Sequence, residues 1–432
     1  MATSRLQTTD RADKRELILR TAALHFNERG FNDTRLEDVA AELDTAKTSI
    51  SYHFKSKKAL LEAAYIETCD VYTGLLADAS QDATGLGRII RWVELLGATH
   101  SQILVGKAGR IALLNDMLAF EQDAAEEIAA RIGMHFAKIE AFINEGCADG
   151  SISTPEERGS AYFVWNLANW IEGWLAAMPF HRHQAAISGL VRLVSLGLAT
   201  DRSAELVTGT PQSESDSDTA LFNREARARL KRDAFERAGI RSFNRTGYSN
   251  FSLNALTSEL GASRGSFYYS FEDKDELLEK CVSRSLRQMS QSLDQAAETR
   301  RSAIEKLQLI CTSLYTGHFS DLDPLLRPCL FASLSPGKQA VAEAEMQNIA
   351  AKLARLVAEC FEDESGSSHG TDKLELVLLG SLLSMATSRH ITLPGDGGRL
   401  KPPPAGAYFR TVFRGLAPID EEDAITSIAG RG

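Results

Sequence analysis

Apolar residues recur every three or four positions through most of the chain, and no stretch alternates strictly between apolar and polar residues. This spacing predicts an all-α protein. The most informative stretch is residues 247–278, where Gly261 separates two apolar repeats. The first repeat consists of Leu253, Leu256 and Leu260. In the second repeat Phe267 and Phe271 lie four residues apart, so the stretch predicts two short helices joined at the glycine.

The residues that flank these two helices suit a helix-turn-helix. Ser252 and Ser263 precede the helices as N-caps, and Gly261 can adopt the left-handed conformation that a tight reversal needs. The second helix, near 263–270, is small and polar at its front, so it can approach base edges closely. Because the second helix of such a unit enters the major groove, the stretch predicts a DNA-reading unit.

The same pattern occurs a second time, at residues 30–61. The matching pairs are Gly30 with Gly247, Leu36 with Leu253, Glu42 with Glu259, Leu43 with Leu260, Ser49 with Ser266, Tyr52 with Tyr269, Phe54 with Phe271, Lys57 with Lys274 and Leu61 with Leu278. Every pair has the same separation, which is about half the length of the 432-residue chain. A period of this size indicates a duplicated domain, far longer than a solenoid unit.

Both copies resemble the N-terminal DNA-binding domain of the TetR family of bacterial transcriptional regulators. The second copy matches the family pattern nearly throughout, from an apolar helix ending in Phe to a Lys followed by Leu-Leu. The first copy departs at Asp44, which replaces the turn glycine, and at Ser51, which replaces a tyrosine of the recognition helix. We expect Asp44 to tolerate the left-handed region at a cost of ~1 kcal/mol, and the first copy to grip DNA less firmly.

The resemblance implies a set of DNA contacts in each copy. The residues expected to face bases are Lys47, Thr48, Ser49, Arg264, Gly265 and Ser266. The residues expected to contact phosphates are Tyr52, His53, Lys57, Tyr268, Tyr269 and Lys274, with Arg35 and Ser252 at the start of the phosphate-binding helix. Arg264 is the best candidate for bidentate reading of guanine.

The remaining pattern is helical in both halves, which resembles the family's C-terminal bundle with its effector pocket and dimer-forming helices. The expected domains are a frayed N-terminus at 1–12, helix-turn-helix domains at 13–60 and 223–278, effector and dimerisation domains at 61–200 and 279–418, a linker at 201–222 and a tail at 419–432. The expected bundle helices lie near 56–79, 88–104, 107–118, 121–149, 156–178 and 183–199, and near 273–297, 301–318, 321–334, 337–362, 371–390 and 406–416. Thr34 is expected to open the second helix as its cap, and 363–371 to form a mobile loop. Near the two ends, Gly415-Leu416-Ala417 matches Gly197-Leu198-Ala199.

The charge distribution fits a specific DNA binder. The net charge is −10, but residues 11–60 hold 10 Lys and Arg against 8 Asp and Glu, and residues 224–280 hold 11 against 9. Mildly basic DNA-reading units on an acidic body favour specific over general nucleic-acid binding. The six cysteines form no close pair, no apolar run reaches ~18 residues, and the N-terminus lacks a secretory pattern, so a cytoplasmic protein with no membrane contact is expected.

A polar and aromatic set on the first bundle is a candidate ligand pocket. It consists of Trp92, His100, Asn115, Trp165, Asn169 and Glu172. The alternative is that the aromatic helix at 161–175 serves the core and the interface between subunits. In the second half, Arg327-Pro328-Cys329 either marks the corresponding pocket or kinks a helix. No P-loop, G-x-S-x-G or G-x-G-x-x-G motif is present, so neither an enzyme nor a cofactor or metal site is predicted.

The sequence thus predicts two tandem TetR-like units, each with a three-helix DNA-binding domain and a helical bundle. The expected function is a sequence-specific transcriptional regulator, a repressor relieved by a small molecule. The alternative is a protein-binding anti-regulator that has kept the fold and lost DNA affinity. Since the two recognition helices differ, pairing of the halves within one chain implies an operator with unlike half-sites, although a homodimer is also possible.

Overall fold

The structure is a computed structural model that describes residues 2–154, 156–199, 202, 205–209, 224–320, 324–362, 373–388 and 402–418. Within these residues every regular element is a helix, and none of the helices is long and apolar enough to cross a membrane. The expectations for the linker at 201–222, the loop at 363–371 and the tail at 419–432 lie wholly or largely outside the described residues.

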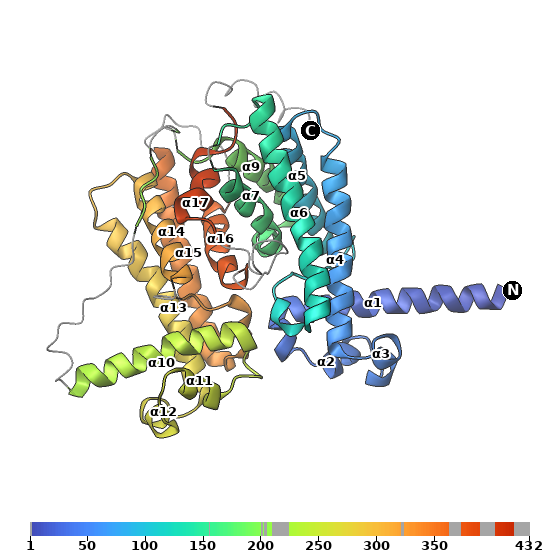
Figure 1. The fold of residues 1–432 in the computed structure, drawn as a ribbon, viewed down its shortest axis with the longest axis horizontal. Coiled ribbons are helices and arrows are strands. Elements are labelled where there is room, and N and C mark those ends of the chain that lie inside the picture. Colours follow the sequence, from blue (N-terminus) through green and yellow to red (C-terminus); the bar gives the residue numbers. More distant parts are fainter. Residues whose placement is uncertain are drawn as a thin grey trace.

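Each half begins with three helices that we call a head, followed by a bundle that we call a body (Figure 1). The first head consists of α1 (Ala2–Asp33), α2 (Leu36–Glu42) and α3 (Lys47–His53). The first body consists of α4 (Lys57–Ala79), α5 (Gly85–Leu104), η1 (Met117–Ala119), α6 (Gln122–Asp149), α7 (Glu157–Asn166), η2 (Leu167–Asn169), α8 (Ile171–Ala176), η3 (Phe180–Arg182) and α9 (His183–Leu196). The first helix therefore starts before the expected residue 13.

The second half repeats this plan with fewer elements. The second head consists of α10 (Arg224–Thr246), α11 (Leu253–Glu259) and α12 (Arg264–Ser270). The second body consists of α13 (Lys274–Ala297), α14 (Ala303–Phe319), η5 (Pro328–Ser333), α15 (Pro336–Glu362), α16 (Leu374–Ser388) and α17 (Ala405–Arg414). Equivalent residues of the two heads form equivalent cores, such as Phe26 and Phe243, which are both buried.

Two of the expected helices, at 107–118 and 321–334, are not α-helices. In the first body the chain leaves α5 through Gly106 at φ 73° and runs irregularly to η1. There the amide of Ala112 donates to the Thr68 hydroxyl (3.1 Å) and that of Leu113 to the Asn27 side chain (2.8 Å). Amides bound to side chains of other helices are not available to the carbonyl four residues back, so a helix does not form. Residues 324–327 of the second body follow the same course and lead into η5.

Two smaller expectations are also wrong. The single helix at 156–178 is broken into α7, η2 and α8. Thr34 does not cap α2, because its hydroxyl donates back to the carbonyls of His25 (3.0 Å) and Gly30 (2.8 Å), and Arg35 holds the cap position without a side-chain bond.

The two bodies pack directly against each other through α7, α8 and α9 of the first and α16 and α17 of the second. Their contact is closest at Gly159, where an added Cβ would lie 2.6 Å from the Ala407 carbonyl oxygen. Tyr408 inserts between Tyr162 and Phe163, with ring centroids 5.8 and 5.6 Å away. Tight helix crossing and interlocked aromatic rings make this contact a continuous core.

The ends of α9 and α17 exchange backbone hydrogen bonds, as the matching tripeptides at these ends suggest. The amide of Leu198 donates to Val412 (2.9 Å), and in return the amide of Leu416 donates to Val194 (3.0 Å). Glycine at 197 and 415 has φ 74° and 67°, and a Cβ at either position would meet the backbone of the other segment at 2.5 Å or less. Equivalent segments of the two halves therefore meet in a reciprocal way.

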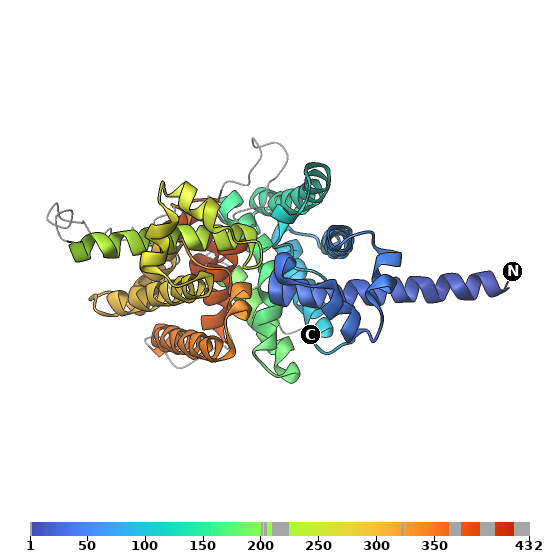
Figure 2. The same cartoon turned by 90° about the horizontal axis from the view of Figure 1, so that it is seen from below.

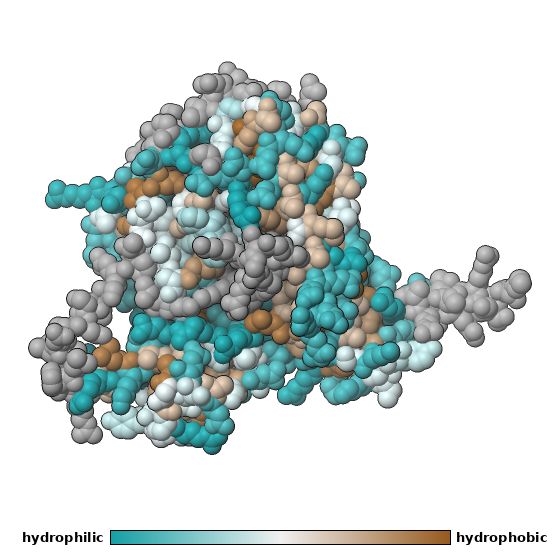
Figure 3. All heavy atoms as spheres, in the orientation of Figure 1, coloured by the Kyte–Doolittle hydropathy of each residue, from teal (hydrophilic) through white to brown (hydrophobic). Residues whose placement is uncertain are grey.

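Both heads lie at the same end of the molecule, beneath their bodies, and sit side by side when viewed from below (Figures 1 and 2). The face in Figure 3 is mostly hydrophilic, with hydrophobic residues in small groups. The fold thus presents α3 and α12 in one direction.

Candidate nucleic-acid interface

The second head is built as a helix-turn-helix with both short helices capped. Ser252 accepts from the Ala255 amide at the start of α11 (3.3 Å), and Ser263 from the Ser266 amide at the start of α12 (3.2 Å). Gly261 between the helices has φ 57°, as the turn requires. Side-chain caps of this kind contribute ~1 kcal/mol each to helix stability.

Aromatic side chains fix α12 to α10. The Phe235 ring lies 5.7 Å from that of Phe267 and 6.1 Å from that of Phe271, and all three are buried. Since these rings occupy one side of α12, its opposite side faces solvent. The recognition helix is thereby held rigidly, which a surface that reads DNA requires.

The outer side of α12 carries the predicted DNA-binding residues. Tyr268 and Tyr269 are 59% and 71% exposed, and Arg264, Gly265 and Ser263 are exposed as well. The Nε of Arg264 donates to the Asn254 side-chain oxygen of α11 at 2.6 Å, which directs the guanidinium across the front of the helix-turn-helix. Exposed tyrosines beside an oriented arginine suit contacts to phosphates and a base edge.

The first head has the same geometry with different chemistry. Asp44 adopts φ 47° and takes the place of the turn glycine. On α3, Tyr52 is 67% exposed and Thr48 is exposed, while Lys47 forms an ion pair with Glu37 of α2 at 2.7 Å. The cap positions Arg35 and Ala46 make no side-chain hydrogen bond. The first recognition helix is thus uncapped, and its leading cation is paired with a carboxylate.

Lys57 and Lys274 have intramolecular partners. The ammonium of Lys57 donates to the carbonyls of Phe31 (2.7 Å), Asn32 (3.2 Å) and Thr34 (2.8 Å), and burial lowers its pKa. The ammonium of Lys274 donates to the Tyr248 carbonyl (3.3 Å) and lies 3.8 Å from the centre of that ring. Both lysines therefore close the loop after the long head helix, and their contact with phosphate stays a prediction. His53 and Ser49 of the first head are half-buried.

The structure brings together four of the six predicted pocket residues. In the first body the Trp92 and Trp165 rings stack 6.4 Å apart, and Tyr72 lies 5.9 Å from each. His100 lies 3.5 Å from the Tyr72 hydroxyl and 3.0 Å from the Glu172 carboxylate. The indole nitrogen of Trp92 and the Nδ1 of neighbouring His135 are buried without a hydrogen-bond partner.

The other two predicted pocket residues lie elsewhere. Asn169 donates to Asn166 (2.9 Å), which in turn donates to Tyr408 of the second body (2.7 Å). Asn115 lies at the junction of the two heads, beside a cavity of about 360 Å³. Polarity on an apolar helix does not distinguish a pocket from an interface, so the sequence pattern grouped three sites as one.

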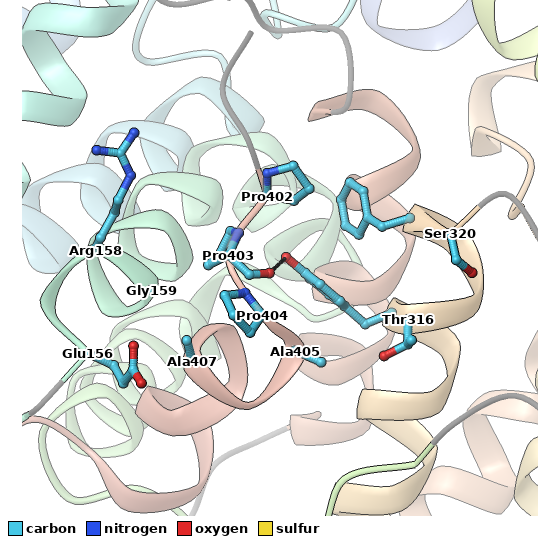
Figure 4. A pocket seen from close by; sticks show the side chains of 12 residues that line it. Glu156, Arg158, Gly159, Thr316, Ser320, Pro402, Pro403, Pro404, Ala405 and Ala407 are labelled. Atoms are coloured by element: carbon cyan, nitrogen blue, oxygen red, sulfur yellow. Dashed lines mark hydrogen bonds between the residues drawn. The ribbon is translucent and has the colours of Figure 1, made fainter. Parts of the chain in front are cut away.

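A larger cavity, of about 810 Å³, opens between the two bodies (Figure 4). Its walls come from the start of α7, the end of α14 and the segment at 402–407. Tyr315 borders it and donates its hydroxyl to the Pro403 carbonyl at 2.7 Å. None of the predicted pocket residues lines it.

The residues that connect heads and bodies were assigned no role by the sequence patterns. Asn27 binds the Ile111 carbonyl (3.0 Å), and its equivalent Asn244 binds the Leu325 carbonyl (2.8 Å). The signal was present, since an asparagine recurs at matching positions within two otherwise apolar helix faces. Arg327, flagged only for a pocket or kink, reaches the opposite half.

Comparison with known proteins agrees with this geometry. The family "Bacterial regulatory proteins, tetR family" matches residues 18–64 and 237–281. The HTH-type transcriptional regulator RutR of Escherichia coli (strain K12) is 33% identical over 82 residues, which are 19% of this chain and 39% of RutR. The uncharacterized HTH-type transcriptional regulator YerO of Bacillus subtilis (strain 168) is 36% identical over 131 residues, 29% of this chain and 44% of YerO. The chain thus spans less than half the length of these curated relatives.

Among solved structures, a TetR family transcriptional regulator, PfmR from Thermus thermophilus, is similar to 40% of this chain over 97% of its own. The identity is 19% and the TM-score 0.34.

The chain is therefore an all-α protein with two helix-turn-helix heads at one end. Because the tetR family matches both heads, the chain belongs to that family in a tandem form, with two units in one polypeptide.

Proposed function

We propose that this chain is a sequence-specific DNA-binding transcriptional regulator that acts as a single-chain pseudo-dimer on an operator with unlike half-sites. The observation that supports it most is the presence of two exposed, rigidly backed recognition helices of different sequence at one end of the molecule. The direct packing of the two bodies supports pairing within the chain. Family membership and the names of the relatives support a regulatory role.

We further propose that it is a repressor relieved by a small apolar or aromatic molecule bound in the first body. The unpartnered nitrogens of Trp92 and His135 within one aromatic cluster support this site, because buried polar atoms without a partner are costly unless something binds them. A ligand that favours a different separation of the heads lowers operator affinity by its differential binding. A screen of metabolites should find a compound that raises the melting temperature and weakens DNA binding.

The function is tested by sequencing the genomic DNA fragments that the purified full-length protein retains. On a retained fragment, Arg264→Ala should weaken specific binding by ~1–3 kcal/mol and relax the preference at one base pair. Tyr269→Phe should weaken binding to all sequences alike, because it removes a phosphate contact. Retention of no specific fragment would favour the protein-binding anti-regulator instead, and a uniform loss with Arg264→Ala would remove its base-reading role.

A further inference from the structure

A buried ion pair joins the two halves at the point where both heads meet. The Arg327 Nη2 donates to the Asp116 Oδ1 at 2.8 Å, and their side chains are only 7% and 11% exposed. Asp116 lies in the first body just before η1, and Arg327 in the second body just before η5. A pair so well removed from water holds a defined geometry, unlike the mobile ion pairs of protein surfaces.

Each member of this pair also holds its own head. The second oxygen of Asp116 accepts from the Phe31 amide at the end of α1 (2.7 Å). The Nη1 of Arg327 donates to the Asn244 carbonyl in α10 (3.2 Å). The chain of contacts therefore runs from the first head through Asp116 and Arg327 to the second head.

The ends of the two heads are bonded to each other beside this pair. Asn32 donates to the Thr246 carbonyl at 2.6 Å. The Asp33 carboxylate accepts from the amides of Tyr248 (3.2 Å) and Ser249 (2.8 Å). Next to them lies the cavity of about 360 Å³, which Asp116 and Arg327 both line. Because this space is not filled by packed side chains, the polar contacts carry the junction between the heads.

The pair joins unlike positions of the two halves. Leu113 and Arg327 are equivalent, since their amides donate to the equivalent asparagines Asn27 and Asn244. Three residues further on, Asp116 corresponds to Leu330, which is buried. If two second halves paired with each other, Arg327 would face a leucine and remain a buried charge without a counter-ion. That arrangement is strongly unfavourable, so the pair favours first-with-second contact.

We propose that Asp116 and Arg327 form a lock that pairs unlike halves and holds α3 and α12 at one separation. The lock thereby sets the half-site spacing that the protein accepts. This inference rests on the proposed function for its meaning on DNA, but its geometry can be measured without DNA.

The first test measures the distance between the heads in the full-length protein. Spin labels are placed by unnatural amino acids at Lys55 and Glu272, which are exposed, equivalent and outside the predicted DNA contacts. The wild type should give one narrow distance distribution, and Arg327→Met should give one at least about twice as wide. The matched control is Arg131→Met, which breaks a more exposed pair with Asp70 and should leave the distribution unchanged.

The second test uses synthetic operators whose half-sites are moved apart one base pair at a time. The wild type should prefer one spacing, and Arg327→Met should bind that spacing about tenfold more weakly, with a flatter preference. Affinity for an isolated half-site should not change, because neither residue belongs to a recognition helix. A purely structural role would instead lower both affinities together.

Asp116→Asn serves as a second variant if Arg327→Met does not fold. It keeps an acceptor for the Phe31 amide and removes only the charge, and the same broadening is expected. An unchanged narrow distribution in a folded variant would overturn the lock while leaving DNA binding intact. A wild type that binds no specific DNA would overturn the proposed function, whereas the label distances would still support or overturn the lock.

Discussion

Glu37 and Asn254 occupy equivalent positions at the front of the two heads, and each contacts the leading basic residue of its recognition helix. Glu37 pairs with Lys47 at 2.7 Å, and the hydrogen bond from Lys47 holds the pKa of Glu37 below its usual range. Asn254 accepts from Arg264 at 2.6 Å without carrying a charge. A carboxylate here neutralises the lysine and repels nearby phosphates, so the first head is expected to bind DNA more weakly.

Exchanging these two side chains tests that difference. Glu37→Asn should raise operator affinity about threefold to tenfold (~1 kcal/mol) and steepen the dependence on salt concentration, because Lys47 becomes available to phosphate. Asn254→Glu should change both quantities in the opposite direction. Titrations at several salt concentrations measure them, and an unchanged affinity and slope for Glu37→Asn would mean that the first head does not touch DNA.

His135 makes the first body sensitive to acid. Burial lowers the pKa of His135 from 6.5 to about 4, and its Nε2 is hydrogen-bonded to Thr73 at 2.8 Å. The unfolded chain therefore binds a proton between pH 6.5 and 4 that the folded chain does not, so stability is full above pH 6.5 and falls as the pH is lowered towards 4.

His135→Gln should remove this part of the pH dependence. The free energy of unfolding, measured in denaturant at about pH 7.5 and about pH 4.5, should fall by up to ~3 kcal/mol more in the wild type than in the variant. The two proteins should be affected equally by the other titrating groups. Equal losses in both would show that His135 is protonated as easily in the folded as in the unfolded chain.

Sequence patterns located single residues well only where their contacts are local. The left-handed conformation of Asp44 and the caps Ser252 and Ser263 follow from neighbours within a few positions. The contact between Asp116 and Arg327 joins residues more than 200 positions apart, and no local pattern contains such information.

The helices themselves were largely predictable, because most of them bury one apolar face. The expected helices at 121–149 and 337–362 are observed as α6 and α15 with ends shifted by one residue at most. The failures at 107–118 and 321–334 have one cause. These segments give their amides to the side chains of Asn27, Thr68 and their equivalents, so an apolar pattern typical of a helix is satisfied in irregular backbone.

The caps of the two recognition helices offer a matched pair of changes. Ala46→Ser should stabilise α3 by ~0.5–1 kcal/mol, because serine can accept from the Ser49 amide as Ser263 does from Ser266. Ser263→Ala should destabilise α12 by a similar amount. Hydrogen exchange of the α3 and α12 amides measures both, and a change in exchange at α12 after Ala46→Ser would contradict a local effect.

At the scale of the molecule, duplication has left two unequal halves. All four tryptophans lie in the first half, three of them within residues 165–174 beside α16, whereas the capped recognition helix without a paired carboxylate lies in the second. The repeat was evident in the sequence, but the reciprocal bonds between the ends of α9 and α17 were not. This asymmetry supports a division of labour, with the proposed ligand site in the first body and the stronger DNA contact in the second head.

The central claim is that one chain forms the complete DNA-reading unit. Light scattering on the free and DNA-bound protein, combined with footprinting of the bound fragment, tests it most directly. The account predicts a monomer in solution and one chain on each operator, with two unlike half-sites protected about one helical turn (~34–36 Å) apart. Two chains bound to one perfect palindrome would contradict it, because like halves would then pair between chains.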